Sequence, residues 1–296
     1  MAKDFLKKLI GRSGFQLKRV KRRAAGRKPP PVLFDDLHEA LHYDRGGVAA
    51  SFRCPLTHCV HRSGLNFSKG GWHPFVETLR ECEDENRLTY EQSSLKKFFE
   101  KWQPASAHQA IAGFTDAPGL FRSLLPHLFY LSPWVSKSVE QVDKATRTWH
   151  KRDEEEHGKA HLDMERDGFV DFGPVSQEKG QLEFHRLTRY YRQIKKEGYQ
   201  SSYGSPQVLV LRRDDEYRFV VSGDGYHRMA ILTALGYDEV PATFYSPWFI
   251  SLDDIAYWPQ VRKGVWSREN AARYFHHLFD FDSKAWAREI GLVHPA

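Results

Sequence analysis

The feature that most constrains the fold is a strand, turn and helix pattern over residues 219–236. Phe219 to Val221 are apolar and β-branched or aromatic, which is typical of a buried strand. A tight turn is expected at Ser222-Gly223-Asp224-Gly225, because glycine adopts backbone angles that other residues avoid. Apolar residues recur at helical spacing from Met229, and Gly236 stands where a helix would end. The stretch therefore predicts a buried strand that leads directly into the start of a helix.

The start of this helix is a candidate phosphate site. A helix N-terminus carries free N–H groups and a partial positive charge, both of which favour a bound phosphate. His227 and Arg228 fall in the first turn, and arginine matches phosphate with a planar fork of donors. Asp224 lies beside them as a candidate base or Mg²⁺ ligand. The alternative is that Gly-Asp-Gly is ordinary loop chemistry. Nucleotide chemistry is the leading hypothesis for this stretch.

The residues around the turn resemble a known fold family. The carrying segments are Pro206 to Leu211, Tyr217 to Val221, Asp224-Gly225-Tyr226-His227-Arg228, Ala230, Gly236 and Val240-Pro241-Ala242. Over roughly residues 169–245 this order is similar to the ParB/sulfiredoxin-like fold, whose members include partition proteins, sulfiredoxin and free serine kinase. Tyr226 stands where sulfiredoxin has its reactive cysteine, so sulfinic acid reduction is not expected. The Asp-Gly start is most similar to the serine kinase branch.

The resemblance implies a set of site residues and ligands. The implied nucleotide contacts are Ser222, Gly223, Gly225, Tyr226, His227 and Arg228, with Lys179 and Arg186 from the preceding helix. It implies catalytic roles for Asp224, His227 and Glu183, with Asp224 as the Mg²⁺ ligand and ATP or ADP as the nucleotide. Each of Lys179, Glu183 and Arg186, taken alone, is also explained as a solvated surface charge.

The positive charge of the chain is concentrated in a tail. Residues 1–28 hold eleven Lys or Arg and one acid, a net charge of +10, so the other 268 residues carry −4 of the total of +6. The mildly acidic body argues against a broad DNA-binding surface, and no specific DNA partner is expected. Apolar residues on one helical face of the tail favour docking on an anionic membrane surface. A disordered basic tail that binds RNA is an equal alternative.

The remaining chain predicts an α/β (α+β) protein in four parts. Residues 1–31 form the basic tail and linker, 32–164 a mostly helical region, 165–246 the ParB/sulfiredoxin-like module, and 247–296 a helical C-terminal cap. Within these parts, helices are expected over 94–102, where Ser94 is a candidate cap, and over 135–152. Residues 153–157 are expected to be a charged surface, and a helix that Gly198 ends is expected to follow residues 173–180.

Three cysteines do not make a disulfide framework, and a reducing cytoplasm is the expected compartment. Cys54, His58, Cys59 and His61 place four possible zinc ligands within eight residues. Zinc sites usually draw ligand pairs from two separated segments, and no second pair at ordinary spacing follows. Buried structural cysteines with loop histidines are therefore the favoured interpretation, and a zinc site is the alternative.

Together these patterns predict a kinase that moves a phosphoryl group from ATP or ADP to a small hydroxyl substrate, such as a sugar or polyol. The chain also resembles proteins encoded among polysaccharide-assembly genes, which implies a role in cell-surface polysaccharide or lipopolysaccharide assembly, in the cytoplasm or at the inner membrane surface. Two alternatives remain. One is a non-catalytic, nucleotide-gated binding protein at the membrane surface. The other is a ParB-like nuclease, against which the acidic body argues.

Overall fold

The computed structural model describes residues 30–84, 88–200, 204–222 and 225–293. The chain divides into two units, Met1–Pro30 and Pro31–Ala296, and the fold below is that of the second unit. The predicted basic tail lies outside the described residues, as do Gly223 and Asp224 of the predicted turn. In the described part of the chain, every helix is too short or too polar to cross a membrane.

The strands of the described residues form one six-stranded mixed sheet. Their order is β1-β2-β6-β4-β5-β3, where β4 pairs antiparallel with β5 and parallel with β6. The strands are β1 (Val32–Phe34), β2 (Ala50–Pro55), β3 (Cys59–Val60), β4 (Gln207–Arg213), β5 (Glu216–Ser222) and β6 (Glu239–Ser251). Helices accompany this sheet, so the predicted mixed α/β class is confirmed.

The sheet is not confined to the predicted module at 165–246. Three of its strands come from residues 32–60, which were expected to be mostly helical, and β6 continues to Ser251. These early strands were not predicted, and two of them are very short: β1 has three residues and β3 has two. Such lengths show no period-2 pattern, and pairing with β2 and β5 is what makes them strands.

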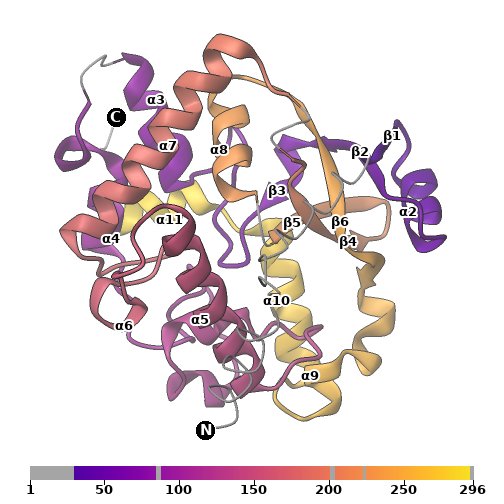
Figure 1. Cartoon of the computed structure of the whole chain (residues 1–296). Helices are drawn as coiled ribbons and strands as arrows, with labels where there is room; N and C mark the ends of the chain where they lie inside the picture. Colours follow the sequence, from indigo (N-terminus) through magenta and orange to yellow (C-terminus); the bar gives the residue numbers. More distant parts are fainter. Residues whose placement is uncertain (1–29, 85–87, 201–203, 223–224, 294–296) are drawn as a thin grey trace, which may run out of the picture. The chain divides into compact units, whose positions relative to one another are not determined.

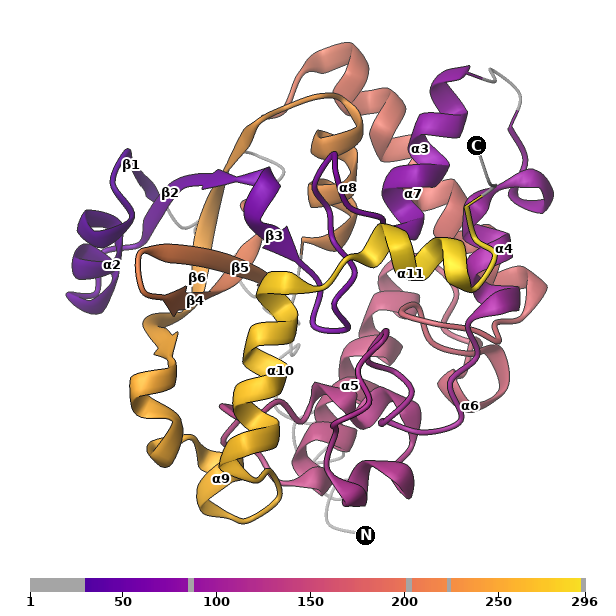
Figure 2. The same ribbon diagram turned by 180° about the vertical axis from the view of Figure 1, so that it is seen from behind.

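The two helices that flank the predicted site end as expected, but the earlier of them begins within residues 173–180, which were expected to precede it. Helix α8 (Tyr226–Ala234) follows β5, and Gly236 after it has a positive φ of 82°. Helix α7 (Gln177–Glu197) begins at Ser176, whose hydroxyl accepts from the Lys179 N–H, and it ends at Gly198. Figures 1 and 2 show α8 between the sheet and the pair α3 and α7, and α8 packs against both.

The other helices are α2 (Leu37–Arg45), α3 (Pro74–Asp84), α4 (Ser94–Lys101), α5 (Val139–Glu156), α6 (Met164–Asp167), α9 (Pro259–Arg262), α10 (Arg268–Asp280) and α11 (Ser283–Glu289). The cap of α4 is Ser93 rather than Ser94, because the Ser93 side chain accepts from the Lys96 N–H. Helices α9 to α11 follow β6 in the C-terminal region, drawn in yellow tones in Figure 2.

The core next to α10 is aromatic and fixes the chain around residue 62. Trp266 and Tyr274 are fully buried and pack against each other with ring centroids 5.3 Å apart. The Tyr274 hydroxyl donates to the backbone carbonyl of Arg62 at 2.7 Å. Because that hydrogen bond is buried, it holds the backbone of Arg62 against α10.

Candidate functional site

Two pockets meet at the start of α8. The small pocket has a volume of about 50 Å³ and is lined by ionisable side chains of several elements, among them His61, His73, Asp171, Glu183, Arg186 and His227. The large pocket has a volume of about 710 Å³ and is rich in aromatic residues, with Tyr130, Trp134, Tyr245, Trp248, Tyr257 and Trp258 among its lining residues. Tyr226 and Trp149 line both pockets. The first residue of α8 therefore stands in the wall between a polar cavity and an aromatic one.

The local chain explains why glycine and tyrosine stand at this point. Gly225 has a φ of 154°, and a Cβ there would lie 2.9 Å from Pro206, so only glycine fits without displacement. The hydroxyl of Tyr226 donates to the Val221 carbonyl at 3.3 Å, which ties α8 to β5. Ser222 ends β5 and lines the large pocket.

Two residues that were predicted to be catalytic lie in contact. Nε2 of His227 is 3.2 Å from Oε2 of Glu183, and the imidazole stacks on Phe75 with ring centroids 4.8 Å apart. Burial lowers the pKa of His227, and the hydrogen bond to Glu183 opposes that shift. Burial alone would raise the pKa of Glu183, but the charges of Lys179 and Arg186 hold it well below its usual range. The Glu183 carboxylate can therefore only accept, so Nε2 of His227 carries the proton.

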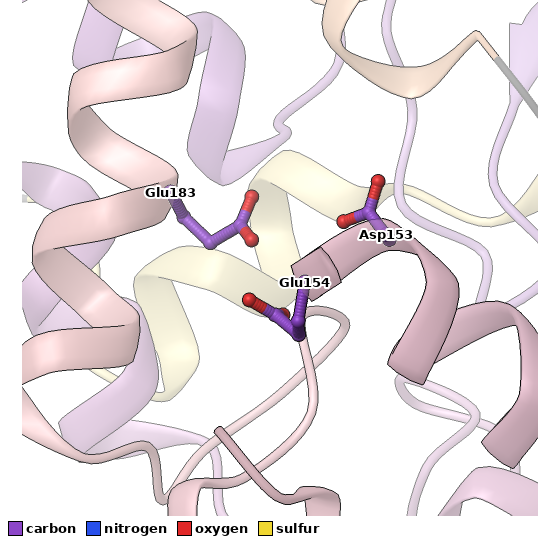
Figure 3. Close-up of side chains that lie close together, drawn as sticks. All are labelled: Asp153, Glu154 and Glu183. Carbon is purple, nitrogen blue, oxygen red and sulfur yellow. The ribbon is translucent and has the colours of Figure 1, made fainter. Parts of the chain in front are cut away.

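Glu183 belongs to a buried ion cluster between α5 and α7, whose three carboxylates appear in Figure 3. The Lys179 amino group contacts Glu154 and lies 2.8 Å from Glu183. Arg186 forms a two-pronged pair with Asp153 at 2.6 and 3.0 Å and contacts Glu183 at 3.0 Å. The side chains of Lys179, Glu154 and Glu183 are at most 1% exposed. Two cations and three carboxylates leave the fully ionised cluster with a net charge of −1.

The burial of Glu154 in this cluster contradicts the prediction that residues 153–157 form a charged surface. Glu154 is buried because the last turn of α5 lies beside the first turns of α7, where Lys179 forms an ion pair with it. Oxygen ligands of Asp153, Glu154 and Glu183 lie within 4.8 Å of one another, a spacing that could hold a metal ion. Lys179 and Arg186 already occupy the cation positions among these oxygens, so the described arrangement fits ion pairs rather than a metal. Asp224, the predicted Mg²⁺ ligand, lies outside the described residues.

The other predicted site residues are spread around the pockets. Arg186, Tyr226 and His227 line the small pocket, whereas Lys179 lines neither pocket, and we assign it a structural role in the ion cluster. Arg228 also lines neither pocket; a Cβ added to Gly204 would lie 2.9 Å from its guanidinium.

The zinc alternative is not supported by the geometry. The thiols of Cys54 and Cys59 lie 3.5 Å apart and both residues are buried, and the three cysteines are free. His61 turns away to Ser63. Among the described residues, the carboxylate cluster is the one group with metal-ligand spacing. The cysteines are core residues, and burial raises the pKa of Cys54 well above its usual range.

The large pocket contains a charge that the sequence did not reveal. Arg62 is 5% exposed and lines this pocket, where its guanidinium donates to the Ser132 and Ser222 hydroxyls at 3.2 and 3.0 Å. It also lies over the ring of Tyr130, 5.7 Å from the centroid. Its Nε has no hydrogen-bond partner, and among the described residues no carboxylate pairs with it. A buried cation without an anion is costly, so the pocket favours an anionic ligand.

The buried histidines predict that stability falls in acid. Burial lowers the pKa of His61 to about 3 and that of His277 to about 4. Below about pH 6.5 the unfolded chain binds protons at these rings and the folded chain does not, so unfolding is favoured as pH falls, by about 1.4 kcal/mol per pH unit for each ring. Burial raises the pKa of Asp171 to about 7. Between about pH 7 and 4 the folded chain therefore binds a proton at Asp171 that the unfolded chain does not, which offsets the loss of stability caused by one of the two rings.

Urea unfolding at pH 7, 6 and 5 measures this dependence. The wild type should lose stability at each step, and His277→Gln should show a shallower slope because one neutral ring is removed. A stability that stays constant from pH 7 to 5 would contradict the assignment.

Comparisons of the chain with protein-family models, with curated proteins and with solved structures find no match. The fold and the site define a mixed α/β protein that joins a polar pocket to an aromatic one at a helix N-terminus.

Proposed function

We propose that this protein is a nucleotide-dependent phosphotransferase that moves a phosphoryl group to a small hydroxyl substrate. The observation that carries the proposal is Arg62, a buried guanidinium without a carboxylate partner among the described residues, next to Ser222 at the end of β5. Arginine is the preferred partner of phosphate because its planar fork of donors matches phosphate oxygens. In this proposal Arg62 holds the phosphates of ATP or ADP, and Ser222 supports it.

The large pocket suits the rest of a nucleotide. Its volume of about 710 Å³ lies within the roughly 300–1,000 Å³ that small-molecule sites occupy. Aromatic faces such as those of Trp134 and Trp258 are suited to stack on a base, and Tyr245 and Trp248 stand at exposed positions of β6. The alternative is that these aromatic residues only pack the hydrophobic core. Tyr245 and Trp248 argue against it, because they are 49% and 60% exposed.

The small pocket suits the acceptor. Phosphoryl transfer depends mainly on positioning and on neutralising charge, and the small pocket adjoins the large one at Tyr226. With Nε2 donating to Glu183, the neutral ring of His227 has Nδ1 available to accept a hydrogen bond from the substrate. The cavity of about 50 Å³ admits only a few heavy atoms, so one hydroxymethyl or hydroxyl group of a larger sugar or polyol would enter it.

A ParB/sulfiredoxin-like fold and a bound Mg²⁺ are parts of the same proposal. The consecutive elements β4, β5, α8 and β6 carry the residues that resemble the ParB/sulfiredoxin-like fold. Mg²⁺ at Asp224 remains a prediction on a residue outside the described ones. When bound, the metal would neutralise charge on the transferred phosphoryl group.

Labelled nucleotide and a panel of small alcohols test the proposed function. Purified protein is incubated with γ-labelled ATP or β-labelled ADP, Mg²⁺ and individual sugars or polyols, and labelled product is separated by chromatography. We expect transfer that requires an acceptor. A nucleotide-gated switch would bind without turnover, and a nuclease would cleave nucleic acid without nucleotide. Either result would replace the proposal.

We also propose that residues 1–28 dock on anionic membrane. The segment carries a net charge of +10 against a body of −4, and each basic residue near an anionic surface contributes about 1 kcal/mol. The full chain should sediment with anionic liposomes at low salt and less so at high salt, because screening shortens the range of the attraction. A chain that starts at residue 29 should remain in solution and still bind nucleotide. The proposal would be contradicted if the full-length protein did not bind anionic liposomes but bound RNA through the tail.

A further inference from the structure

A buried group of polar side chains connects the two pockets. Asp171 lines the small pocket, Tyr130 lines the large one, and the Tyr130 hydroxyl donates to Oδ2 of Asp171 at 2.7 Å. The other carboxylate oxygen, Oδ1, lies 3.5 Å from Nε2 of His61, which also lines the small pocket. The side chains of Asp171 and His61 are 6% and 3% exposed. These three residues have no part in the nucleotide contacts proposed above.

The tautomer of His61 is set by its neighbours. Its Nδ1 accepts the Ser63 backbone N–H at 3.2 Å, so the proton of the neutral ring is on Nε2. The ring is neutral at ordinary pH because burial, helped by the charge of Arg62, lowers its pKa to about 3. Nε2 has no hydrogen-bond partner within the described residues, and it lies 3.5 Å from Oδ1 of Asp171. His61 therefore presents an N–H toward that side of Asp171.

Asp171 has no strong cation in contact. Among the described residues, His61 is the one basic side chain within ion-pair distance. Burial raises the pKa of Asp171 to about 7, the nearby Glu183 charge adds to the shift, and the Tyr130 hydrogen bond and the more distant Lys179 oppose it. The titratable groups that face it are His61, Tyr130, Tyr226, Glu183 and Lys179. A carboxyl group in this environment can accept and release a proton near neutral pH.

We infer that Asp171 is the catalytic proton acceptor for the substrate hydroxyl in the small pocket, and that Tyr130 and His61 are its positioning residues. The inference rests on the proposed function and names the base of that reaction. The hydroxyl proton passes to Asp171 while the hydroxyl oxygen forms the new P–O bond. The bond to the leaving nucleotide breaks, and the nucleotide keeps the electron pair on its phosphate oxygen. Asp171 gives the proton to water after the product leaves.

Rates across pH in two variants test this role. Transfer is measured from pH 5 to 9 in the wild type, Asp171→Asn and Tyr130→Phe. Asp171→Asn should be slower by at least about 10²-fold and lose the acid limb of the pH profile, with nucleotide affinity unchanged. Tyr130→Phe should remain active with its acid limb moved to higher pH, because the hydroxyl that holds the pKa of Asp171 down is gone. Wild-type rates in Asp171→Asn, or an unmoved limb in Tyr130→Phe, would overturn the inference.

Infrared spectroscopy separates this inference from the proposed function. If the wild type transfers phosphate to none of the alcohols, the proposed function fails, but the carboxyl band can still be titrated in the wild type minus Asp171→Asn difference spectrum. A band that titrates near pH 7, and higher in Tyr130→Phe, supports Asp171 as a proton acceptor. A carboxylate that stays ionised from pH 5 to 9 overturns it, whatever the protein transfers.

Discussion

Replacing Lys179 by methionine is expected to destabilise the fold by about 3–5 kcal/mol, because breaking a buried ion pair leaves its partner charged and unpaired. Lys179 is 1% exposed, and its amino group lies against both Glu154 and Glu183. Methionine fills a similar volume but carries no charge. Glu183 would then keep Arg186, Glu154 would lose its lysine partner, and one of the two carboxylates would take up a proton. Urea unfolding at pH 7 measures the loss.

The same helix supplies a matched control. Lys195 also lies on α7 and also pairs with a carboxylate, Glu83, but both side chains are about half exposed. Lys195→Met should therefore cost less than about 1 kcal/mol, as surface ion pairs usually do. Adding Glu154→Gln to Lys179→Met should recover part of the loss, since one unpaired charge is removed. Equal effects at the two lysines would mean that the buried cluster does not stabilise the fold.

The second large effect concerns Arg62 and has opposite consequences for binding and for stability. Arg62→Met should weaken nucleotide binding by about 1.5–3 kcal/mol, roughly 10- to 140-fold in Kd, the contribution of a charge-assisted hydrogen bond. The free protein should be no less stable than the wild type, because a buried charge without an anion is removed. A purely structural arginine would behave in the reverse way, with stability lost and binding kept.

Tryptophan fluorescence reports the binding, since Trp134, Trp149, Trp248 and Trp258 line the large pocket. Arg53 is a suitable control because it is half exposed and paired with Asp35 and Glu239. Arg53→Met should leave nucleotide affinity as it is. Equal losses of affinity in the two variants would place the cause in net charge rather than in the pocket.

Helix ends that are marked by a residue close by in the sequence were the part of the fold that the sequence predicted best. Gly198 and Gly236 act within one turn, so the ends of α7 and α8 were predicted to within two residues, whereas α7 begins at Gln177, inside the segment 173–180 that was expected to precede it. The neighbours of His227 were foreseen only in part: Glu183 was predicted as a second carboxylate, but its burial was not. A single buried carboxylate has no distinctive local pattern.

The residues that sequence reasoning missed are brought together by long-range packing. Arg62 meets Ser222 across 160 positions of the chain, and Tyr130 meets Asp171 across 41. Glu154 was taken for a surface charge because α5 is polar on most of its length, and only its contact with Lys179 buries it. His61 was noticed for its spacing from the cysteines, yet its contacts are Ser63 and Asp171. Side-chain chemistry in this site depends on tertiary contacts that no periodicity encodes.

Equilibrium dialysis of labelled ATP and ADP against the wild type and Arg62→Met tests whether Arg62 binds the phosphates of a nucleotide. We expect saturable binding of at least one of these nucleotides to the wild type with one site per chain, and a Kd at least roughly ten-fold weaker in a folded Arg62→Met variant. A wild-type protein that binds neither nucleotide, or a variant that binds as tightly as the wild type, would contradict this expectation.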